Sequence, residues 1–291
     1  MMPLPGRWLS CALVRCGSTL TLLDCGEGTQ IPWKSLGWGF RQLGAICFTH
    51  MHADHVAGLP GVLFMVAHAG RTEPLDIYGP PGTIYVVEGL RRIVAELPFA
   101  VQMHELKSGE HFALPGGLQG SCNAAAHGVP CLAYRLELER NPAFLPEQAQ
   151  ALGLPVQLWS RLQRGETLEY SGQTITPEQV LGPPRRGISL AFITDTRPTQ
   201  QLSAFAHDVD LLICESMYDD PGDLPLAKAH AHMLAEEAAR IAQAASARSL
   251  LLTHFSPKIT DPSGAEKAAK HVFANARAAR DGMIVTLEYP T

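Results

Sequence analysis

The most constraining feature of the 291-residue sequence is a cluster of ligand-capable side chains directly after a short apolar run, Ala45–Phe48. Imidazole and carboxylate groups suit zinc and its neighbours among the divalent metals. A buried strand fixes the backbone at its end, so the loop that follows can direct alternate side chains to one point. Four such groups exceed what one tetrahedral ion with an open position needs from one segment, which predicts two adjacent metal ions. The cluster is Thr49-His-Met-His-Ala-Asp-His55, with His50, His52, Asp54 and His55 as the candidate ligands.

Two metal ions need more ligands than this segment supplies. Three further residues follow mostly apolar runs in the same way: His127, Asp195 and His254. Considered one at a time, each of these residues is as consistent with an ordinary turn as with a metal ligand. Taken together, they complete two metal shells, so we expect all three to be ligands.

The order of predicted elements favours an α/β fold. Short apolar runs predict strands at 8–14, 19–23, 45–48, 75–78, 189–193, 211–214, 250–252 and 284–288, the first two forming a hairpin. Longer segments predict helices at 59–68, 82–97, 234–245 and 263–279. Alternating strands and helices with early antiparallel pieces predict a sandwich of two sheets with helices outside.

Composition narrows the class of protein. The chain is 46% apolar and 18% charged, and no apolar run approaches the roughly 18 residues that a membrane span needs. The first ten residues lack the pattern of a secretory signal, and the seven cysteines form no CxxC pair, so we expect reduced, buried thiols in a cytoplasmic protein. The net charge of −5 argues against a generally basic nucleic-acid binder but leaves room for a local basic patch.

The ligand pattern resembles that of the metallo-β-lactamase superfamily, and the flanking residues narrow the resemblance. Four segments look like motifs of the ribonuclease Z family of tRNA 3′-processing endonucleases: Leu22-Leu-Asp-Cys-Gly-Glu-Gly-Thr-Gln30, Gly58-Leu-Pro-Gly61, Ile193-Thr-Asp-Thr-Arg197 and Thr253-His-Phe-Ser256. The resemblance covers nearly the whole chain. It implies an αββα fold with two mixed sheets, two Zn²⁺ ions per chain (with Mn²⁺ or another divalent metal as alternatives), precursor tRNA as substrate, and a homodimer.

The positions of the family motifs also imply which ligands bind each of the two metal ions. One metal ion is assigned His50, His52, His127 and Asp195. The other is assigned Asp54, His55, His254 and again Asp195, which would bridge the two. Asp54 has two readings, as a ligand only or also as the acceptor of a proton from the attacking water.

A phosphodiester also needs its leaving oxygen protonated. Two segments resemble the family motifs that carry a Glu–His pair for this purpose, and they imply that Glu215 acts with His232. A neighbouring carboxylate favours the protonated imidazole. The alternatives are that His232 only caps the following helix, or that His230 takes the role. We expect Asp24 to hold a ligating histidine in orientation.

The segment 141–186 is rich in proline and has no long periodic stretch, which predicts an inserted arm or small subdomain within a single domain covering 1–291. It lies where ribonuclease Z carries its tRNA-gripping arm. Trp159 is expected in the core of the arm. Four arginines offer charge that can pair with phosphate: Arg161, Arg164, Arg185 and Arg186.

The resulting hypothesis is a zinc-dependent endoribonuclease that removes the 3′ trailer of precursor tRNA and leaves a 3′-hydroxyl. The alternatives are a superfamily phosphodiesterase or esterase for small substrates, and a protein that binds RNA or metal without turnover. Members of the family usually open with an apolar strand ahead of the segment that 2–8 resembles, so a further upstream strand is also expected.

Overall fold

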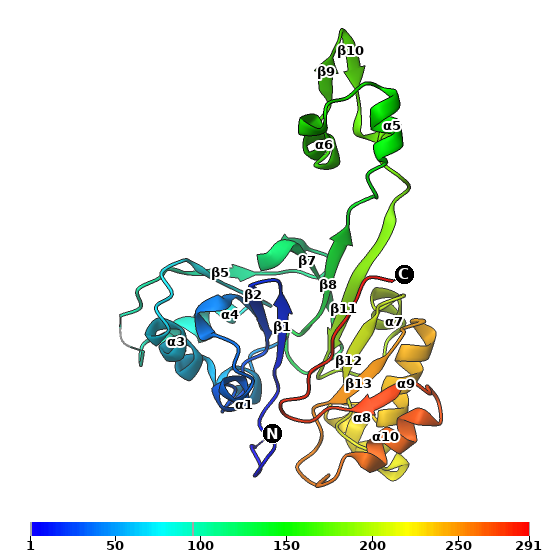
Figure 1. Cartoon of the computed structure of the whole chain (residues 1–291). Helices are drawn as coiled ribbons and strands as arrows, with labels where there is room; N and C mark the ends of the chain where they lie inside the picture. The colour runs from blue at the N-terminus through cyan, green and yellow to red at the C-terminus, as the bar shows by residue number, and fades with distance from the viewer. Residues whose placement is uncertain (1, 95, 291) are drawn as a thin grey trace. The chain divides into compact units, whose positions relative to one another are not determined.

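The computed structural model describes residues 2–94 and 96–290. Within those residues the strands form two large sheets and a small hairpin (Figure 1). The larger compact unit comprises the chain up to Glu137 together with Ser189–Leu287. The smaller unit comprises Leu138–Ile188 and the residues from Glu288 onward.

The first sheet has the order β1-β2-β3-β4-β5. Its strands are β1 (Ala12–Cys16), β2 (Thr19–Leu23), β3 (Leu43–Cys47), β4 (Leu75–Gly79) and β5 (Val101–Glu105). β1 and β2 form the predicted antiparallel hairpin, although β1 starts later than predicted, and the remaining pairs are parallel. β1 lies at the edge of this sheet, and the further strand expected ahead of it stays a prediction.

Three helices pack their apolar side chains onto this sheet. They are α1 (Gln30–Ser35), α3 (Leu59–His68) and α4 (Thr83–Arg91). Trp33, Val62 and Val87, one from each helix, are buried in a single core with β2, β3 and β4. The predicted helix at 59–68 is confirmed in full.

The second sheet has the order β14-β13-β12-β11-β8-β7-β6 and mixes parallel with antiparallel pairs. Its strands are β6 (His111–Ala113), β7 (Leu118–Ala124), β8 (Leu132–Arg140), β11 (Arg185–Ile193), β12 (Leu211–Glu215), β13 (Leu250–Thr253) and β14 (Ala276–Ala278). Helices cover its outer face through alanine and leucine side chains: α7 (Gln200–Phe205), α9 (Ala235–Ala244) and α10 (Ser263–Lys270).

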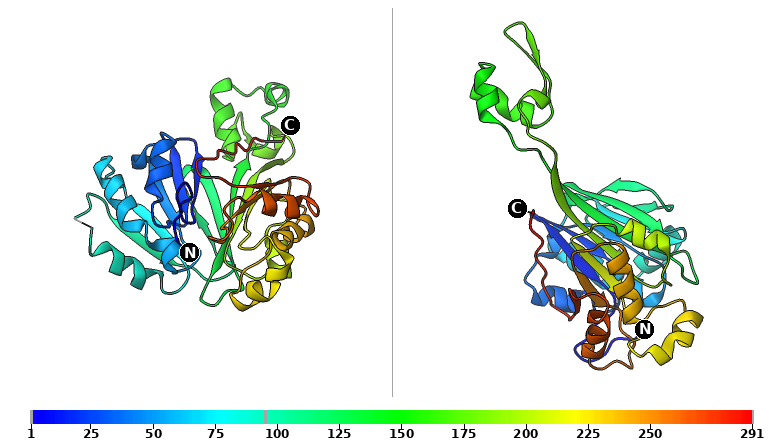
Figure 2. Two further views of the ribbon diagram at one scale, coloured as in Figure 1. Left: turned by 90° about the horizontal axis from the view of Figure 1, so that it is seen from below. Right: turned by 90° about the vertical axis from the view of Figure 1, so that its right-hand side faces the viewer.

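The layering of the larger unit is therefore helix, sheet, sheet, helix, as predicted, and Figure 2 shows the helices on the outer side of each sheet. The two sheets also contact each other directly. The buried Tyr134 hydroxyl of β8 donates to the carbonyl of Phe48, just past β3, at 2.7 Å. Among the described residues no helix combines the length and the apolar character needed to cross a bilayer.

The helix predicted over 82–97 is too long. Gly82, with φ of 101°, is the N-cap of α4, which ends at Arg91. The Val94 amide then bonds three residues back to the Arg91 carbonyl, a tight turn that ends the helix. Val94 and Leu97 still pack on the core, so the apolar pattern that predicted a helix is satisfied by irregular chain.

Two predictions near the C-terminal end are also wrong. The helix predicted over 263–279 ends at Lys270, and Ala276–Ala278 is strand β14. Alanine favours helix intrinsically, but the Asn275 carbonyl accepts from the Leu250 amide at 3.0 Å and starts a parallel strand beside β13. The segment predicted as a strand at 284–288 has no strand pairing, and Ile284 there is 57% exposed.

The smaller unit has a core of its own. It contains α5 (Pro146–Ala151), α6 (Val156–Gln163), and the hairpin of β9 (Leu168–Tyr170) and β10 (Gln173–Ile175). Leu154, Leu162 and Ile175 are among its buried residues. Trp159 packs on this core and donates from its indole nitrogen to the Leu154 carbonyl at 3.1 Å, as expected of a packing residue.

Candidate metal centre

The candidate ligands lie where strands end. The motif 49–55 follows β3, and Asp195 and His254 follow β11 and β13. Asp195 and His254 have positive φ values of 49° and 55°, and Asp24 after β2 has 56°. This left-handed conformation is uncommon for residues with a side chain, although Asp and His are enriched in it. The chain therefore turns sharply just past each strand, at a cost typical of functional sites.

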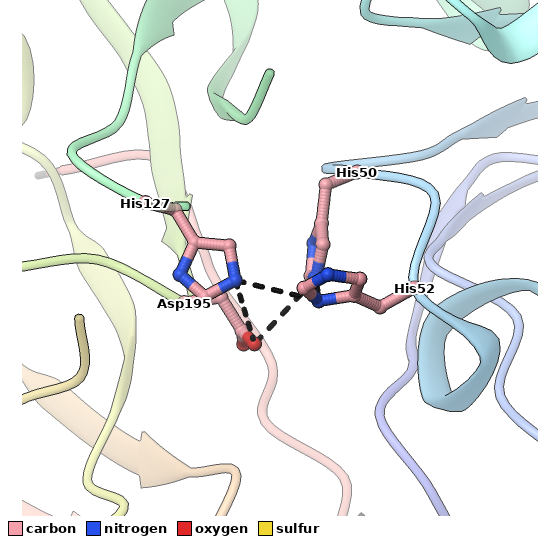
Figure 3. A group of neighbouring side chains, drawn as sticks. All are labelled: His50, His52, His127 and Asp195. Carbon is pink, nitrogen blue, oxygen red and sulfur yellow. Dashed lines mark hydrogen bonds and ion pairs between the residues drawn. The ribbon is translucent and has the colours of Figure 1, made fainter. Parts of the chain in front are cut away.

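The first group of ligands comprises His50, His52, His127 and Asp195, whose ligand atoms all lie within 4.8 Å of one another. Figure 3 shows His50 and His52 on one side and His127 and Asp195 on the other. His52 Nδ1 is 2.9 Å from His50 Nε2 and 3.4 Å from His127 Nε2. An Asp195 carboxylate oxygen, Oδ2, is 3.6 Å from His50 Nε2. His52 is exposed, so the centre is open on that side.

The second group comprises Asp54, His55 and His254. Its histidines face each other, with 3.1 Å between their Nε2 atoms. The other Asp195 oxygen, Oδ1, is 3.4 Å from His55 Nε2 and 3.2 Å from His254 Nε2. The two oxygens of one carboxylate thus face the two groups.

The outward ring nitrogens of three histidines have fixed partners. His55 Nδ1 is 2.7 Å from the buried Asp24 carboxylate, which confirms the position expected for Asp24. His50 Nδ1 is 3.1 Å from the Thr49 hydroxyl, and His127 Nδ1 is 3.3 Å from the Ala231 carbonyl. A proton held on an outward nitrogen leaves a lone pair on the inward one. Inward nitrogens that face one another in this way are a donor set suited to divalent cations.

The pKa shifts differ among the histidines of the centre. Burial lowers the pKa of His55, but the charges of Asp24 and Asp195 outweigh it and raise the pKa well above its ordinary value. Burial, helped by the neighbouring His55, lowers the pKa of His50 to about 2. Burial also lowers the pKa of His127. Burial opposes ionisation of Asp195, but the charges of His254 and His55 overcome it and hold its pKa well below the usual range.

His232 lies beside both groups but has a different partner. Its Nδ1 is 3.1 Å from the Glu215 carboxylate, and its Nε2 is 4.0 Å from Asp195 Oδ2. Burial lowers the pKa of His232, but the hydrogen bond and charge of Glu215 outweigh it and raise the pKa above its ordinary value. The helix α9 begins at Ala235 with Leu234 as its N-cap, so His232 is not the cap. His230 instead contacts the Tyr218 hydroxyl, at 3.1 Å.

Two glycines are needed here because other backbone atoms approach them closely. A side chain at Gly58 would lie 2.1 Å from the Gly26 carbonyl oxygen, and one at Gly26 would lie 2.5 Å from that of Asp54. Neither glycine has positive φ. The contact holds the metal-motif loop against the end of β2.

Sequence reasoning missed the threonines that support the ligands. The Thr49 hydroxyl contacts Asp24 as well as His50, and the Thr194 hydroxyl donates to Asp195 Oδ1 at 2.7 Å. The signal was present, because a threonine directly precedes His50, Asp195 and His254. Thr196 was also missed, although its amide donates to Glu215 at 2.6 Å.

Three of the four arm arginines contact partners within the smaller unit. Arg161 and Arg164 share Glu166, at 2.7 Å and 3.3 Å. Arg185 donates to the Asn141 carbonyl at 2.7 Å, and Arg186 also has an interaction partner. Glu166 therefore offsets part of the positive charge expected to meet phosphate.

The fold and the clustered ligands define a protein of the metallo-β-lactamase superfamily, and the model of the beta-lactamase superfamily domain matches residues 20–255. Ribonuclease Z of Lachnoclostridium phytofermentans is 42% identical over 289 residues, covering 99% of this chain and 95% of that protein. Ribonuclease Z of Agathobacter rectalis is 40% identical with the same coverage. The chain belongs to the ribonuclease Z family.

Solved structures agree with the fold. The short form of human tRNase Z has a TM-score of 0.70 at 21% identity and covers 99% of this chain and 96% of its own. The metallo-beta-lactamase fold protein YhfI of Bacillus subtilis has a TM-score of 0.67 at 21% identity, covering 97% of this chain and 93% of its own. Both likenesses confirm the predicted αββα architecture.

Proposed function

We propose that this protein is a metal-dependent endoribonuclease that cuts precursor tRNA after the discriminator base and leaves a 3′-hydroxyl on the tRNA. The observation that carries the proposal is the pair of ligand groups that share Asp195, in a chain 42% identical to a ribonuclease Z over nearly its whole length.

We propose two Zn²⁺ ions per chain, with Mn²⁺ or another divalent metal as the alternative. His50, His52, His127 and Asp195 would hold one ion, and Asp54, His55, His254 and Asp195 the other. The bridging role is supported by the Asp195 oxygens, one facing His254 and the other facing His50. When bound there, two such ions supply Lewis acidity that activates water and offsets charge on a phosphodiester.

The chain's own residues complete the chemistry. Because the 3′-hydroxyl stays on the tRNA, the leaving group is a ribose 3′-oxygen of high pKa, which needs a proton as its bond to phosphorus breaks. His232 would donate that proton from Nε2, while the Glu215 carboxylate orients the ring and favours its protonated form. Asp54 would be a ligand, and its further role as proton acceptor from the attacking water remains the alternative.

We also propose that the segment 141–186 is a substrate-binding arm. Arg161, Arg164, Arg185 and Arg186 would contact tRNA phosphates, and the likeness to ribonuclease Z supports this placement. The arm carries as many glutamates as arginines. Its affinity for tRNA would therefore come from how the arginines are placed relative to the phosphates and not from the net charge of the arm. We propose a homodimer on the same likeness, and a cytoplasmic location because all seven cysteines are free thiols.

The test is the position of the cut. A precursor tRNA with a 3′ trailer is incubated with the enzyme, and both product ends are sequenced and tested for phosphate. We expect a single cut after the discriminator base, a 3′-hydroxyl on the tRNA, and no product after metal removal by a chelator. Hydrolysis of bis(p-nitrophenyl) phosphate without any cleavage of the tRNA would contradict the proposal and favour a phosphodiesterase for small substrates.

A further inference from the structure

The guanidinium of Arg197 holds the main chain of His232. Arg197 lies two residues after Asp195, and its Nη1 donates to the His232 carbonyl at 2.5 Å. Both Nη atoms also donate to the Glu237 carboxylate, Nη1 to Oε2 at 2.9 Å and Nη2 to Oε1. The two side chains are only 22% and 13% exposed. A bidentate pair of this kind fixes geometry as well as charge.

Glu237 in turn fixes the start of α9. Its Oε2 accepts from the amide of Leu234 at 3.0 Å. Leu234 occupies the N-cap position, where Ser, Thr, Asp or Asn would normally supply a side-chain acceptor for a free helix amide. Leucine has no such acceptor. The carboxylate of Glu237 therefore takes part in the start of the helix, and Arg197 holds that carboxylate in place.

The backbone around His232 needs such support. Ala231, the residue before it, has a left-handed φ of 56°, a conformation disfavoured for alanine. Glu215 contacts the imidazole at Nδ1 and also accepts from the Met233 amide at 3.3 Å, while Arg197 donates to the His232 carbonyl of the same peptide group. The Glu215 carboxylate is itself held by the amide of Thr196, next to Arg197. Thr196 and Arg197, the two residues after Asp195, thus support His232 at two points: Thr196 holds the Glu215 carboxylate that contacts the ring, and Arg197 holds the main-chain carbonyl.

We propose that Arg197, paired with Glu237, is a positioning residue that keeps His232 Nε2 aimed at the leaving oxygen. This rests on the proposed function, in which His232 protonates that oxygen. The guanidinium is occupied by the carbonyl and the carboxylate, so Arg197 acts through His232 and not on the phosphate. A displacement of a reacting group by about 1 Å can lower a rate on the order of 10²-fold.

The experiment compares two substrates that differ in leaving group. Precursor tRNA has a poor leaving group that needs a proton, whereas bis(p-nitrophenyl) phosphate has a good one that does not. The variants are Arg197→Ala, which removes both contacts, and Glu237→Gln, which keeps an oxygen for the Leu234 amide but loses the ion pair. Glu236→Gln is the matched control, because Glu236 pairs with Arg240 on the same helix and has no link to His232. Bound metal is measured for every variant.

We expect Arg197→Ala to lower kcat on precursor tRNA by about 10- to 100-fold, with less than about twofold change on the chromogenic diester and unchanged bound metal. Glu237→Gln should lower kcat on precursor tRNA by a smaller factor, again with little change on the chromogenic diester. Glu236→Gln should change neither. In a His232→Ala background, Arg197→Ala should cause no further loss, because the residue it positions is gone.

Three results would overturn the proposal. Equal losses on both substrates, loss of bound metal in Arg197→Ala, or a further loss in the His232→Ala background would each show that Arg197 does not act through His232. The His232→Ala variant distinguishes failure of the positioning role from failure of the proposed proton-donor role. If it loses activity selectively on tRNA while Arg197→Ala and Glu237→Gln do not, only the positioning role fails. If it shows no selective loss, the proton-donor role fails and the positioning role fails with it.

Discussion

The hydrogen bond from His55 to Asp24 gives the sharpest prediction about the metal centre. The Asp24 carboxylate is fully buried and accepts from the Thr49 amide at 2.8 Å and from His55 Nδ1 at 2.7 Å. Asp24→Asn keeps the shape and tolerates the left-handed φ of 56°. An amide has only one oxygen, so if that oxygen stays on Thr49, an N–H₂ group faces His55.

Two responses are open to His55, and both weaken the site. If the ring keeps its proton on Nδ1, a buried donor loses its acceptor, which costs about 1–3 kcal/mol of unfolding free energy. If the proton moves to Nε2, the lone pair directed at His254 is lost. Changes to such supporting partners typically cost about 10–100-fold in metal affinity. We expect weaker binding of the ion proposed to lie at His55 and His254, with the other proposed ion less affected.

The measurements are metal affinity by chelator competition and unfolding free energy of the metal-free chain in urea. Asp76→Asn is the matched control, since Asp76 makes a similar contact, 2.8 Å to His104 Nε2, with both side chains partly exposed. Asp76→Asn should change the unfolding free energy by less than about 1 kcal/mol and leave the metal affinity unchanged. Wild-type affinity for both ions in Asp24→Asn, or equal losses in the two variants, would refute the reasoning.

Three further predictions concern the reaction and the arm. His232→Ala should keep its metal and lose on the order of 10²–10⁴-fold on precursor tRNA, measured in single-turnover assays; equal loss on bis(p-nitrophenyl) phosphate would count against a proton donor. Deleting 141–186 should abolish tRNA cleavage but preserve hydrolysis of the small diester, and unchanged tRNA cleavage would remove the arm assignment. Arg161→Ala and Arg164→Ala should each weaken tRNA binding and lower the slope of log affinity against log salt by about 0.7–0.9; an unchanged slope would show that neither meets phosphate.

The clustering of the candidate ligands was predictable because its signal is local. Buried apolar strands such as Leu250–Thr253 are visible in sequence, and a polar residue just past the end of each is visible too. The strand ends are also where the structure brings His50, Asp195 and His254 together. Choosing His232 over His230 needed the family likeness, since both precede the same helix, and the contact with Glu215 is what separates them in space.

The errors arose where tertiary contacts decided the outcome. Ala276–Ala278 has the composition of a helix, but pairing with β13 makes it a strand. The support of His232 by Arg197 and Glu237 was not visible, because the partners are 35 and 40 residues from Arg197. The close contact between two loops at Gly26 and Gly58 was not visible either, because sequence spacing does not reveal it.

The central claim is that one carboxylate, that of Asp195, joins two groups of ligands into a single centre for two metal ions. The direct measurement is the number of metal ions per chain by native mass spectrometry, with elemental analysis of the same samples, for the wild type and for Asp195→Ala. We predict two ions in the wild type and one or fewer in the variant, because each group loses a ligand. Two ions retained in Asp195→Ala, or a wild type that binds a single ion at saturation, would contradict the account.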